Sequence, residues 1–229
     1  MRGHLSPHTS DPMLMPDLHF LVRPLFGLAL ASCLALPGVA QGNDAWTQLL
    51  ETYVHESTDG VNRVDYAALS ASTADRATLD TYIASFEARD LAGTDDATFA
   101  AWTNLYNAVT VRYIAEKYPL DSIRDGFLFG GPWKKVTVMA GGREVSLDAI
   151  EHDILRPRFG DPRVHYAINC ASYGCPNLLT RAWTANTLDA DLDAAARAYI
   201  NHPRGVTVGN RGLTVSSIYK WFEVDFDGS

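Results

Sequence analysis

The stretch TFAAWTNLYNAVTVRYIAEK, Thr98 to Lys117, decides the fold of this chain. No charged residue occurs from Phe99 to Val111. Apolar side chains recur there at three- and four-residue steps, and others fall elsewhere around the helix. A helix that is apolar nearly all round is buried in a protein core. The stretch therefore predicts a central helix that the other elements surround.

Two asparagines on this predicted helix, Asn104 and Asn107, are expected to be buried with it. A buried amide must find hydrogen-bond partners. Two interpretations are open at this point. The side chains bond loop backbone and so fix the fold, or one of them orients a catalytic histidine or donates to an oxyanion.

Shorter elements are predicted around this helix from apolar periodicity, turn residues and capping residues. They are, in chain order, a helix at 44–56, an extended piece at 61–69, a helix at 78–89, a β-hairpin at 135–145, a helix at 146–156 capped by Ser146, a strand at 164–169, a helix capped by Thr187 and a second hairpin at 206–215. The predicted fold class is α+β, a mainly helical single domain with a small antiparallel sheet.

Composition places the chain among ordinary globular proteins. It has 229 residues, of which 47% are hydrophobic and 20% charged, and its formal net charge is -8. The few charged residues of the first forty cancel, so the remainder of the chain carries the whole net charge. An acidic chain without a basic run argues against nucleic acid and anionic membrane surfaces as partners.

The first forty residues are expected to be an export signal. The apolar stretch 25–36 is too short to span a bilayer and fits the hydrophobic region of a signal peptide. Cleavage after Ala40 is favoured because apolar residues continue beyond Cys33, but a lipobox ending at Cys33, with a lipid anchor, is the alternative. Met13 or Met15 is a candidate true start. A periplasmic or secreted protein is expected, in a compartment where disulfides persist.

The stretch HYAINCASYGCPNL, His165 to Leu178, holds the two cysteines beyond this signal, Cys170 and Cys175. Proline is favoured at the first position of a helix, so Pro176 predicts a helix whose N-terminus would acidify the Cys175 thiol. The alternative is a disulfide between the two cysteines. Because a bridged sulfur is not a nucleophile, the function depends on which alternative holds.

Glu151 falls on the apolar stripe of the helix predicted after Ser146. A carboxylate is rarely tolerated in such a place without a partner. Either Glu151 pairs with Arg156, Arg158 or Arg163 inside the fold, or it lines a polar cleft beside the cysteine loop.

Two histidines, His152 and His165, are the candidate bases. Asp148 lies one turn before His152 and could hold its imidazole. His165 lies in the predicted strand, where a histidine bonded to backbone is the commoner case. With a cysteine nucleophile and Glu151 as orienter, the parts of a Cys-His hydrolase or acyltransferase are present. No standard metal-ligand spacing occurs, and no metal or cofactor is expected.

Five stretches together resemble the bacterial branch of the family called domain of unknown function 547. They are VDYAAL (64–69), AWTNLYNAVTV (101–111), VSLDAIEHDILR (145–156), DPRVHYAINCASYGCPNL (161–178) and SIYKWFEVDF (217–226). The resemblance implies an exported bacterial domain at 41–229 with a helical body and a small sheet, and it implies no activity. Members of the family usually continue past the last of these blocks, so a truncated C-terminus is expected.

The helix that bears the two asparagines and the strand that bears His165 are also distantly similar to papain-like and transglutaminase-like folds. Those folds have their nucleophile at the head of the buried helix, where this chain has no cysteine.

Two functions are carried forward from the sequence. The leading hypothesis is a Cys-His hydrolase-like or acyltransferase-like site, with the candidate catalytic residues Cys175, Cys170, His152, Glu151, His165, Asn104 and Asn107. The alternative is a non-enzymatic periplasmic protein that binds a small molecule or an envelope protein and has a structural Cys170–Cys175 disulfide. A free, acidic thiol in a cleft would distinguish the first from the second.

Overall fold

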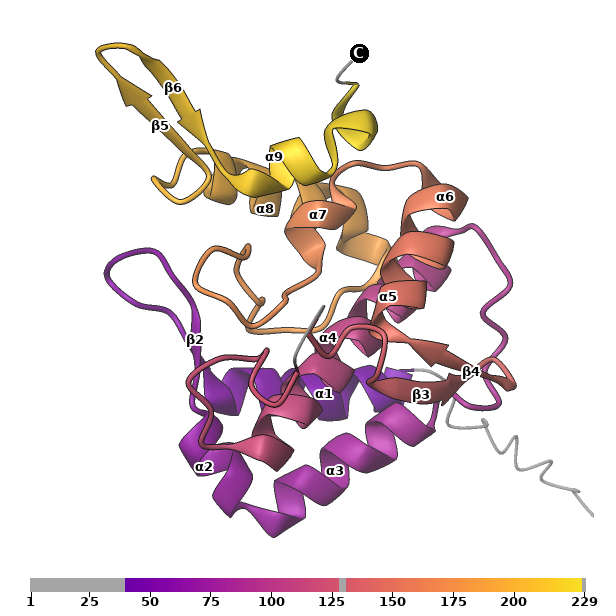
Figure 1. Ribbon diagram of the computed structural model, residues 1–229. Coiled ribbons are helices and arrows are strands. Elements are labelled where there is room, and N and C mark those ends of the chain that lie inside the picture. The colour runs from indigo at the N-terminus through magenta and orange to yellow at the C-terminus, as the bar shows by residue number, and fades with distance from the viewer. Residues whose placement is uncertain (1–39, 128–130, 228–229) are drawn as a thin grey trace, which may run out of the picture. The chain divides into compact units, whose positions relative to one another are not determined.

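Figure 1 presents the computed structural model, which describes residues 40–127 and 131–227. These residues lie in one unit of dense internal contacts, Pro37–Ser229. The predicted signal peptide, the alternative lipid anchor at Cys33 and the candidate starts at Met13 and Met15 lie outside the described residues.

The described chain is mainly helical with small antiparallel sheets, which confirms the predicted fold class. The helical elements are α1 Ala40–Tyr53, α2 Tyr66–Ala71, α3 Thr73–Ala84, α4 Asp96–Lys117, α5 Leu147–Ala149, η1 Ile150–Leu155, α6 Arg156–Phe159, α7 Val164–Ala167, η2 Ala185–Thr187, α8 Leu188–Ile200, α9 Ser217–Trp221 and η3 Glu223–Phe226. The strands pair as β1 Val54–His55 with β2 Arg63–Val64, β3 Thr137–Ala140 with β4 Arg143–Ser146, and β5 Val206–Gly209 with β6 Gly212–Val215. The expected small sheet is thus three separate two-stranded sheets in the described chain.

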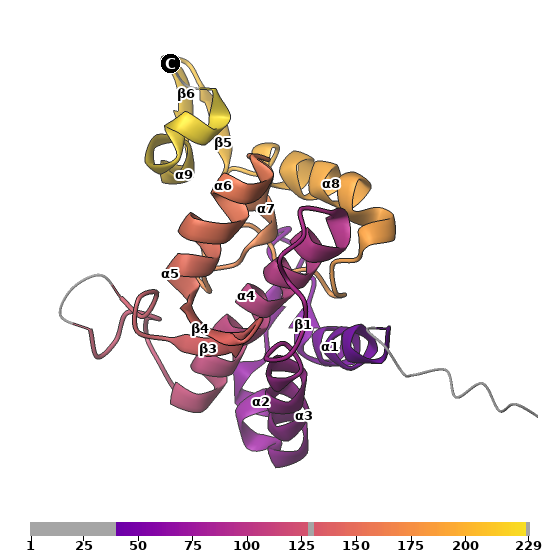
Figure 2. The same cartoon turned by 90° about the vertical axis from the view of Figure 1, so that its right-hand side faces the viewer.

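Helix α4 is the centre of the core, as its sequence predicts. Every residue from Thr98 to Val111 is buried. The helix begins where the Asp95 side chain accepts a hydrogen bond from the Thr98 N–H at 2.7 Å, which caps its first turn. Helices α2 and α3 pack on α4 from one side and the α5–η1 segment from another, and Figures 1 and 2 show this arrangement in two views.

Both predicted hairpins are present. In the first, Val138 pairs with Val145, and the turn is made by Gly141 and Gly142 with φ of 57° and 75°. This left-handed region is accessible to glycine without steric penalty, so the Gly-Gly pair specifies the turn.

The segment expected to be a strand at 164–169 is instead the one-turn helix α7, so that prediction is wrong. All four residues of α7 are buried, and they therefore have no polar face to mark a period. The turn begins at Asp161, whose side chain accepts from the Arg163 N–H at 2.8 Å and whose carbonyl accepts from the Val164 N–H.

Two boundaries in the N-terminal half also differ from prediction. The piece expected to be extended over 61–69 pairs only at Arg63–Val64, and Asp65 then caps α2. Helix α3 begins earlier than expected because Ser72 accepts from the Asp75 N–H and caps it. In the two ranges that the structure describes, no helix is both long enough and apolar enough to cross a membrane.

Candidate functional site

One pocket, of about 290 Å³, brings together five of the seven predicted site residues: Glu151, His152, His165, Cys170 and Cys175. Its volume is at the lower end of the range typical of small-ligand sites. The remaining wall is largely aromatic and apolar, and it includes Tyr106, Trp133, Ile168, Ile218, Trp221 and Phe222. Residues from α4, the α5–η1 segment, α7, the cysteine loop and α9 thus meet at one place.

Asn104 and Asn107 do not line this pocket. Asn104 donates to the Trp183 carbonyl at 2.8 Å and accepts from the Trp183 N–H at 2.9 Å. Asn107 donates to the Ala167 carbonyl at 3.0 Å and accepts from the Asn169 N–H at 2.8 Å. The interpretation that these amides bond loop backbone is therefore confirmed for both.

Glu151 and His152 lie on η1, a π-helical segment inside a longer helical run. Ser146 caps this run by accepting from the Ala149 N–H at 3.1 Å, as predicted. The wider turn is closed by the Arg156 N–H, which donates to the Glu151 carbonyl five residues earlier. Single π-turns of this kind occur often at functional sites, because they change the direction of the side chains that they carry.

The Glu151 carboxyl is buried, with 8% of the residue exposed. Tyr106 Oη donates to Glu151 Oε2 at a long 3.4 Å. Burial raises the pKa of Glu151, and the nearby positive charges oppose that shift only in part.

The interpretation that an arginine pairs with Glu151 is wrong among the described residues. Arg156 bonds Asp225, Arg158 donates to the Leu91 carbonyl, and Arg163 bonds Asp161 and two aspartates of α8. Glu151 instead lines the pocket beside the cysteines.

A hydrogen-bonded network joins both histidines through Arg156 and Asp225. Arg156 Nη1 lies 2.8 Å from His152 Nδ1, and Arg156 Nη2 donates to Asp225 Oδ1 at 3.0 Å. His165 Nε2 lies 2.7 Å from Asp225 Oδ2. An arginine only donates, so His152 Nδ1 accepts and the proton of a neutral His152 is on Nε2. That atom is 3.9 Å from Asp148 Oδ1, so the predicted neighbour is near but beyond hydrogen-bond distance.

His165 is held in a buried, aromatic environment. Its ring stacks on Phe222 with centroids 3.9 Å apart. Burial lowers the pKa of His165, although Asp225 acts in the opposite direction. A neutral His165 donates from Nε2 to Asp225 and keeps Nδ1 as an acceptor.

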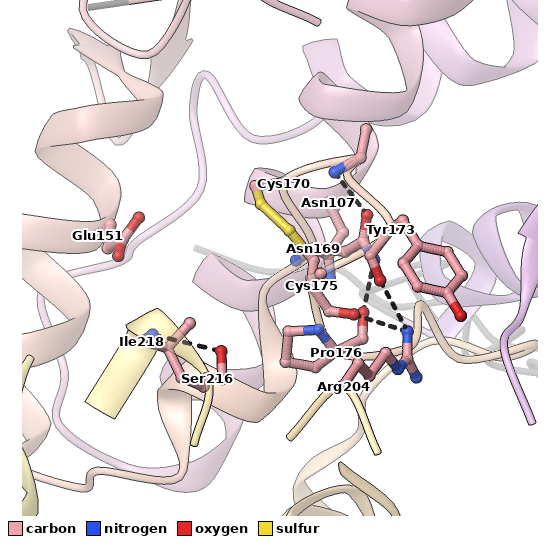
Figure 3. Close-up of a disulfide and its surroundings, with 12 residues drawn as sticks. Asn107, Glu151, Asn169, Cys170, Tyr173, Cys175, Pro176, Arg204, Ser216 and Ile218 are labelled. Atoms are coloured by element: carbon pink, nitrogen blue, oxygen red, sulfur yellow. Dashed lines mark hydrogen bonds between the residues drawn. A yellow bond between two sulfur atoms is a disulfide. The ribbon is translucent and has the colours of Figure 1, made fainter. Parts of the chain in front are cut away.

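Cys170 and Cys175 form a disulfide at the wall of the pocket. Figure 3 shows this bond, with Glu151 on one side of the cysteine loop and Arg204 on the other. Arg204 Nη1 donates to the Cys175 carbonyl at 2.8 Å, and Tyr199 Oη donates to the Gly174 carbonyl at 2.7 Å. The loop is therefore held both by the covalent bond and by side chains from outside it.

The helix predicted to begin at Pro176 is not formed. Backbone groups there bond side chains from elsewhere instead: Asn169 donates to the Pro176 carbonyl at 2.6 Å, and Asn62 donates to the Leu178 carbonyl at 2.9 Å. Cys175 is consequently not at a helix N-terminus, and no helix is present there to acidify its thiol.

Asp225 is a site residue that the sequence patterns did not identify. It lies in the stretch SIYKWFEVDF, where a carboxylate inside an aromatic run was the available signal. The bond with Arg156 lowers the pKa of Asp225 and keeps it ionised. Trp133, which also lines the pocket, was not identified from the sequence either. Its ring lies so close to Gly131, two residues earlier, that a Cβ at this position would overlap it, and Gly131 also has a left-handed φ of 72°.

Among residues 40–127 and 131–227, no three His, Cys, Asp or Glu side chains are grouped so that they could hold a metal ion. The chemistry of the site is that of an apolar, aromatic pocket with a buried carboxyl and two histidines. Such a site suits a small organic ligand.

Comparison with known proteins adds a family match to this description. The model of the family described as "Protein of unknown function, DUF547" matches residues 92–200. The matched segment contains all seven predicted site residues, and it supports the resemblance noted from the sequence. Two of the resembling stretches, 64–69 and 217–226, lie outside it. No curated protein and no solved structure matches the chain.

Proposed function

We propose that this chain is an exported bacterial ligand-binding domain, in which the pocket beside η1 holds a small organic molecule and the Cys170–Cys175 disulfide has a structural role. The observation that carries the proposal is the disulfide itself, since it removes the free thiol that a cysteine nucleophile requires. Export into an oxidising compartment agrees with a disulfide.

The lining of the pocket supports binding of an amphipathic molecule. Trp133, Trp221 and Phe222 supply apolar surface, while Glu151 and His152 supply polar groups of defined direction. A few placed polar groups in an otherwise apolar wall are typical of small-ligand sites, because the wall provides affinity and the polar groups provide specificity.

A fragment screen tests this proposal. Protein labelled with ¹⁵N is titrated with a library of small amphipathic molecules, and chemical-shift changes identify those that bind. Ile218→Trp adds an indole to the pocket wall and is expected to abolish these changes. Val208→Trp adds the same group to the exposed hairpin β5–β6, away from the pocket, and is the matched control. Binding that Ile218→Trp leaves intact, or no binding by any fragment, contradicts the proposal.

A second candidate function is the Cys-His hydrolase or acyltransferase, formed when an external dithiol reduces the disulfide. The specific observation in its favour is that both cysteines and both candidate bases line the same pocket. Reduction would leave two thiols there, in a loop that Arg204 and Tyr199 continue to hold.

The second candidate is tested with an activated acyl ester, p-nitrophenyl acetate. A reduced protein that acts through a thioester gives a burst of nitrophenolate, and the acetyl group is then found on one cysteine by mass spectrometry. The double variant Cys170→Ser/Cys175→Ser should give no burst. Equal rates for the reduced protein and this variant exclude the cysteines as nucleophiles.

A further inference from the structure

Glu151 is buried at the pocket without a cation bonded to it. Among the described residues it accepts one hydrogen bond, from Tyr106. A tyrosine has a single hydroxyl proton, so Glu151 Oε2 is the acceptor here. A carboxylate has about four acceptor sites, and most of those on Glu151 remain available to a ligand that donates.

The cationic side chains near Glu151 are bonded to or paired with other groups. Arg156 directs Nε and Nη2 to Asp225 and Nη1 to His152. An arginine only donates, so His152 Nδ1 is the acceptor of this contact. Lys134 lies 3.9 Å from Asp148, and its side chain is largely in solvent. Of the two carboxyl groups that line the pocket, Asp148 has Lys134 3.9 Å away, and Glu151 has no salt-bridge partner among the described residues.

Two indole rings of the pocket wall have no aromatic or cationic partner among the described residues. In the described part of the chain, neither Trp133 nor Trp221 stacks on another aromatic ring or has an arginine or lysine over its face. Phe222 differs, because His165 and Arg156 already contact its ring. A tryptophan face attracts an organic cation more strongly than any other side-chain ring does.

We infer that the ligand of this pocket is an organic cation, a protonated amine with an apolar body, whose ammonium group donates to Glu151 and whose body packs on Trp133 and Trp221. This inference rests on the proposed binding function and names the chemical class of its ligand. An anionic ligand would place a second negative charge beside a buried carboxyl, and a neutral one would leave the charge of Glu151 uncompensated.

Three probes of matching shape test the inference by isothermal titration calorimetry at pH 7: 2-phenylethylamine, which is cationic, 2-phenylethanol, which is neutral, and 3-phenylpropanoate, which is anionic. The amine is expected to bind at least about tenfold more tightly than the alcohol, and the propanoate is expected to bind most weakly.

Glu151→Gln is expected to remove this preference by weakening the amine about tenfold while changing the alcohol by less than about twofold. Asp153→Asn is the matched control, because Asp153 lies on the same segment but is exposed and outside the pocket, and it should leave all three affinities unchanged. Trp221→Ala should weaken the amine several-fold. Trp221 is 71% exposed, so this variant keeps the fold even where Glu151→Gln alters it.

The outcomes separate this inference from the function on which it rests. Alcohol or propanoate binding as tightly as the amine overturns the inference, as does an amine affinity that Glu151→Gln leaves unchanged. All three probes can fail to bind while other fragments still bind and Ile218→Trp abolishes their binding. That result overturns the organic cation as the ligand class and leaves the binding function in place. Failure of every fragment overturns the binding function itself.

Discussion

Asn104 and Asn107 on α4 and Glu151 on η1 are all buried polar residues, but they differ in how fully they are bonded. Each asparagine both donates to and accepts from the backbone of a distant loop. Glu151 accepts one long hydrogen bond among the described residues, and it borders a pocket.

The number of hydrogen bonds that a buried polar group makes within the protein indicates whether it serves the fold or a site. A group whose donors and acceptors are all bonded within the protein stabilises the fold, since its removal leaves other buried groups unpaired. A group that keeps acceptor capacity at the edge of a cavity is less stable than a fully bonded one, and it is a candidate for the ligand binding proposed above.

The largest effect is expected from truncating an asparagine of α4. Asn104→Ala removes both partners of the Trp183 backbone and leaves a buried N–H and a buried carbonyl unpaired, so the free energy of unfolding should fall by about 2–4 kcal/mol. Urea unfolding at pH 7 measures this. Asn201→Ala removes an exposed asparagine that bonds only the nearby Arg197 carbonyl, and it should change stability by less than about 0.5 kcal/mol. Equal losses of stability in the two variants would contradict a special role of the Asn104 hydrogen bonds in stabilising the fold.

The next largest effect is expected from the disulfide. Replacing both cysteines by serine releases a short loop, whose closure entropy corresponds to about 2 kcal/mol of stability. The variant should still fold, because Arg204 and Tyr199 hold the same loop. Urea unfolding of the variant and of the oxidised protein measures the difference, and an unchanged midpoint would contradict a structural role for the bond.

A smaller effect is expected from Asp225, which links Arg156 to His165. Asp225→Asn should lower stability at pH 7 by about 1 kcal/mol, a modest value because the ion pair is partly screened by solvent. The pKa of Asp225 is lowered in the folded protein, so its contribution is complete above the unfolded value of about 3.9 and is lost as the pH falls through the folded pKa.

The two proteins should therefore converge in stability as the pH is lowered below about 4. Asp227→Asn, which changes an exposed residue close by, is the control. A difference that grows at low pH would contradict the assignment of Asp225 as an ionised partner.

The smallest effect, and one of opposite sign, is expected from Glu151→Gln. Burial raises the pKa of Glu151, so the folded state binds its proton more tightly than the unfolded state does. The wild type is then penalised for ionisation at neutral pH, and its stability rises as the pH falls through the folded pKa. Glu151→Gln should be more stable than the wild type at pH 7, by about 1 kcal/mol or less, and should lose that advantage at low pH. A stability loss larger than this at pH 7 would assign Glu151 to the fold, with the asparagines.

Much of the fold follows from local patterns in the sequence. The buried helix α4, both hairpins and the Ser146 cap were predicted, because apolar periodicity, a Gly-Gly turn and a capping serine each act within a few residues. The strand predicted at 164–169 and the helix predicted after Pro176 failed for a different reason. All residues of α7 are buried, so no polar face marks its helical period, and the segment after Pro176 takes its conformation from hydrogen bonds to distant residues such as Asn62.

The residues of the site could be predicted from the sequence, but the hydrogen bonds between them could not. Glu151, His152, His165 and the cysteines were identified by residue type and position, and they meet at one pocket. Their partners were not identified: Asp225 is 60 residues from His165 and 69 from Arg156, and Tyr106 is 45 from Glu151. Pairings at such separations depend on how the chain folds back on itself.

The central claim is that the cysteines at the pocket wall are bridged, so that the pocket binds a ligand and does not attack one. The most direct test is to purify the protein natively and alkylate it under denaturing conditions, with and without prior reduction. The mass of the proteolytic peptide that contains Cys170 and Cys175 is then measured by mass spectrometry. The account predicts no label on this peptide without reduction and two labels after it. Two labels without reduction would contradict the account and would favour the cysteine nucleophile.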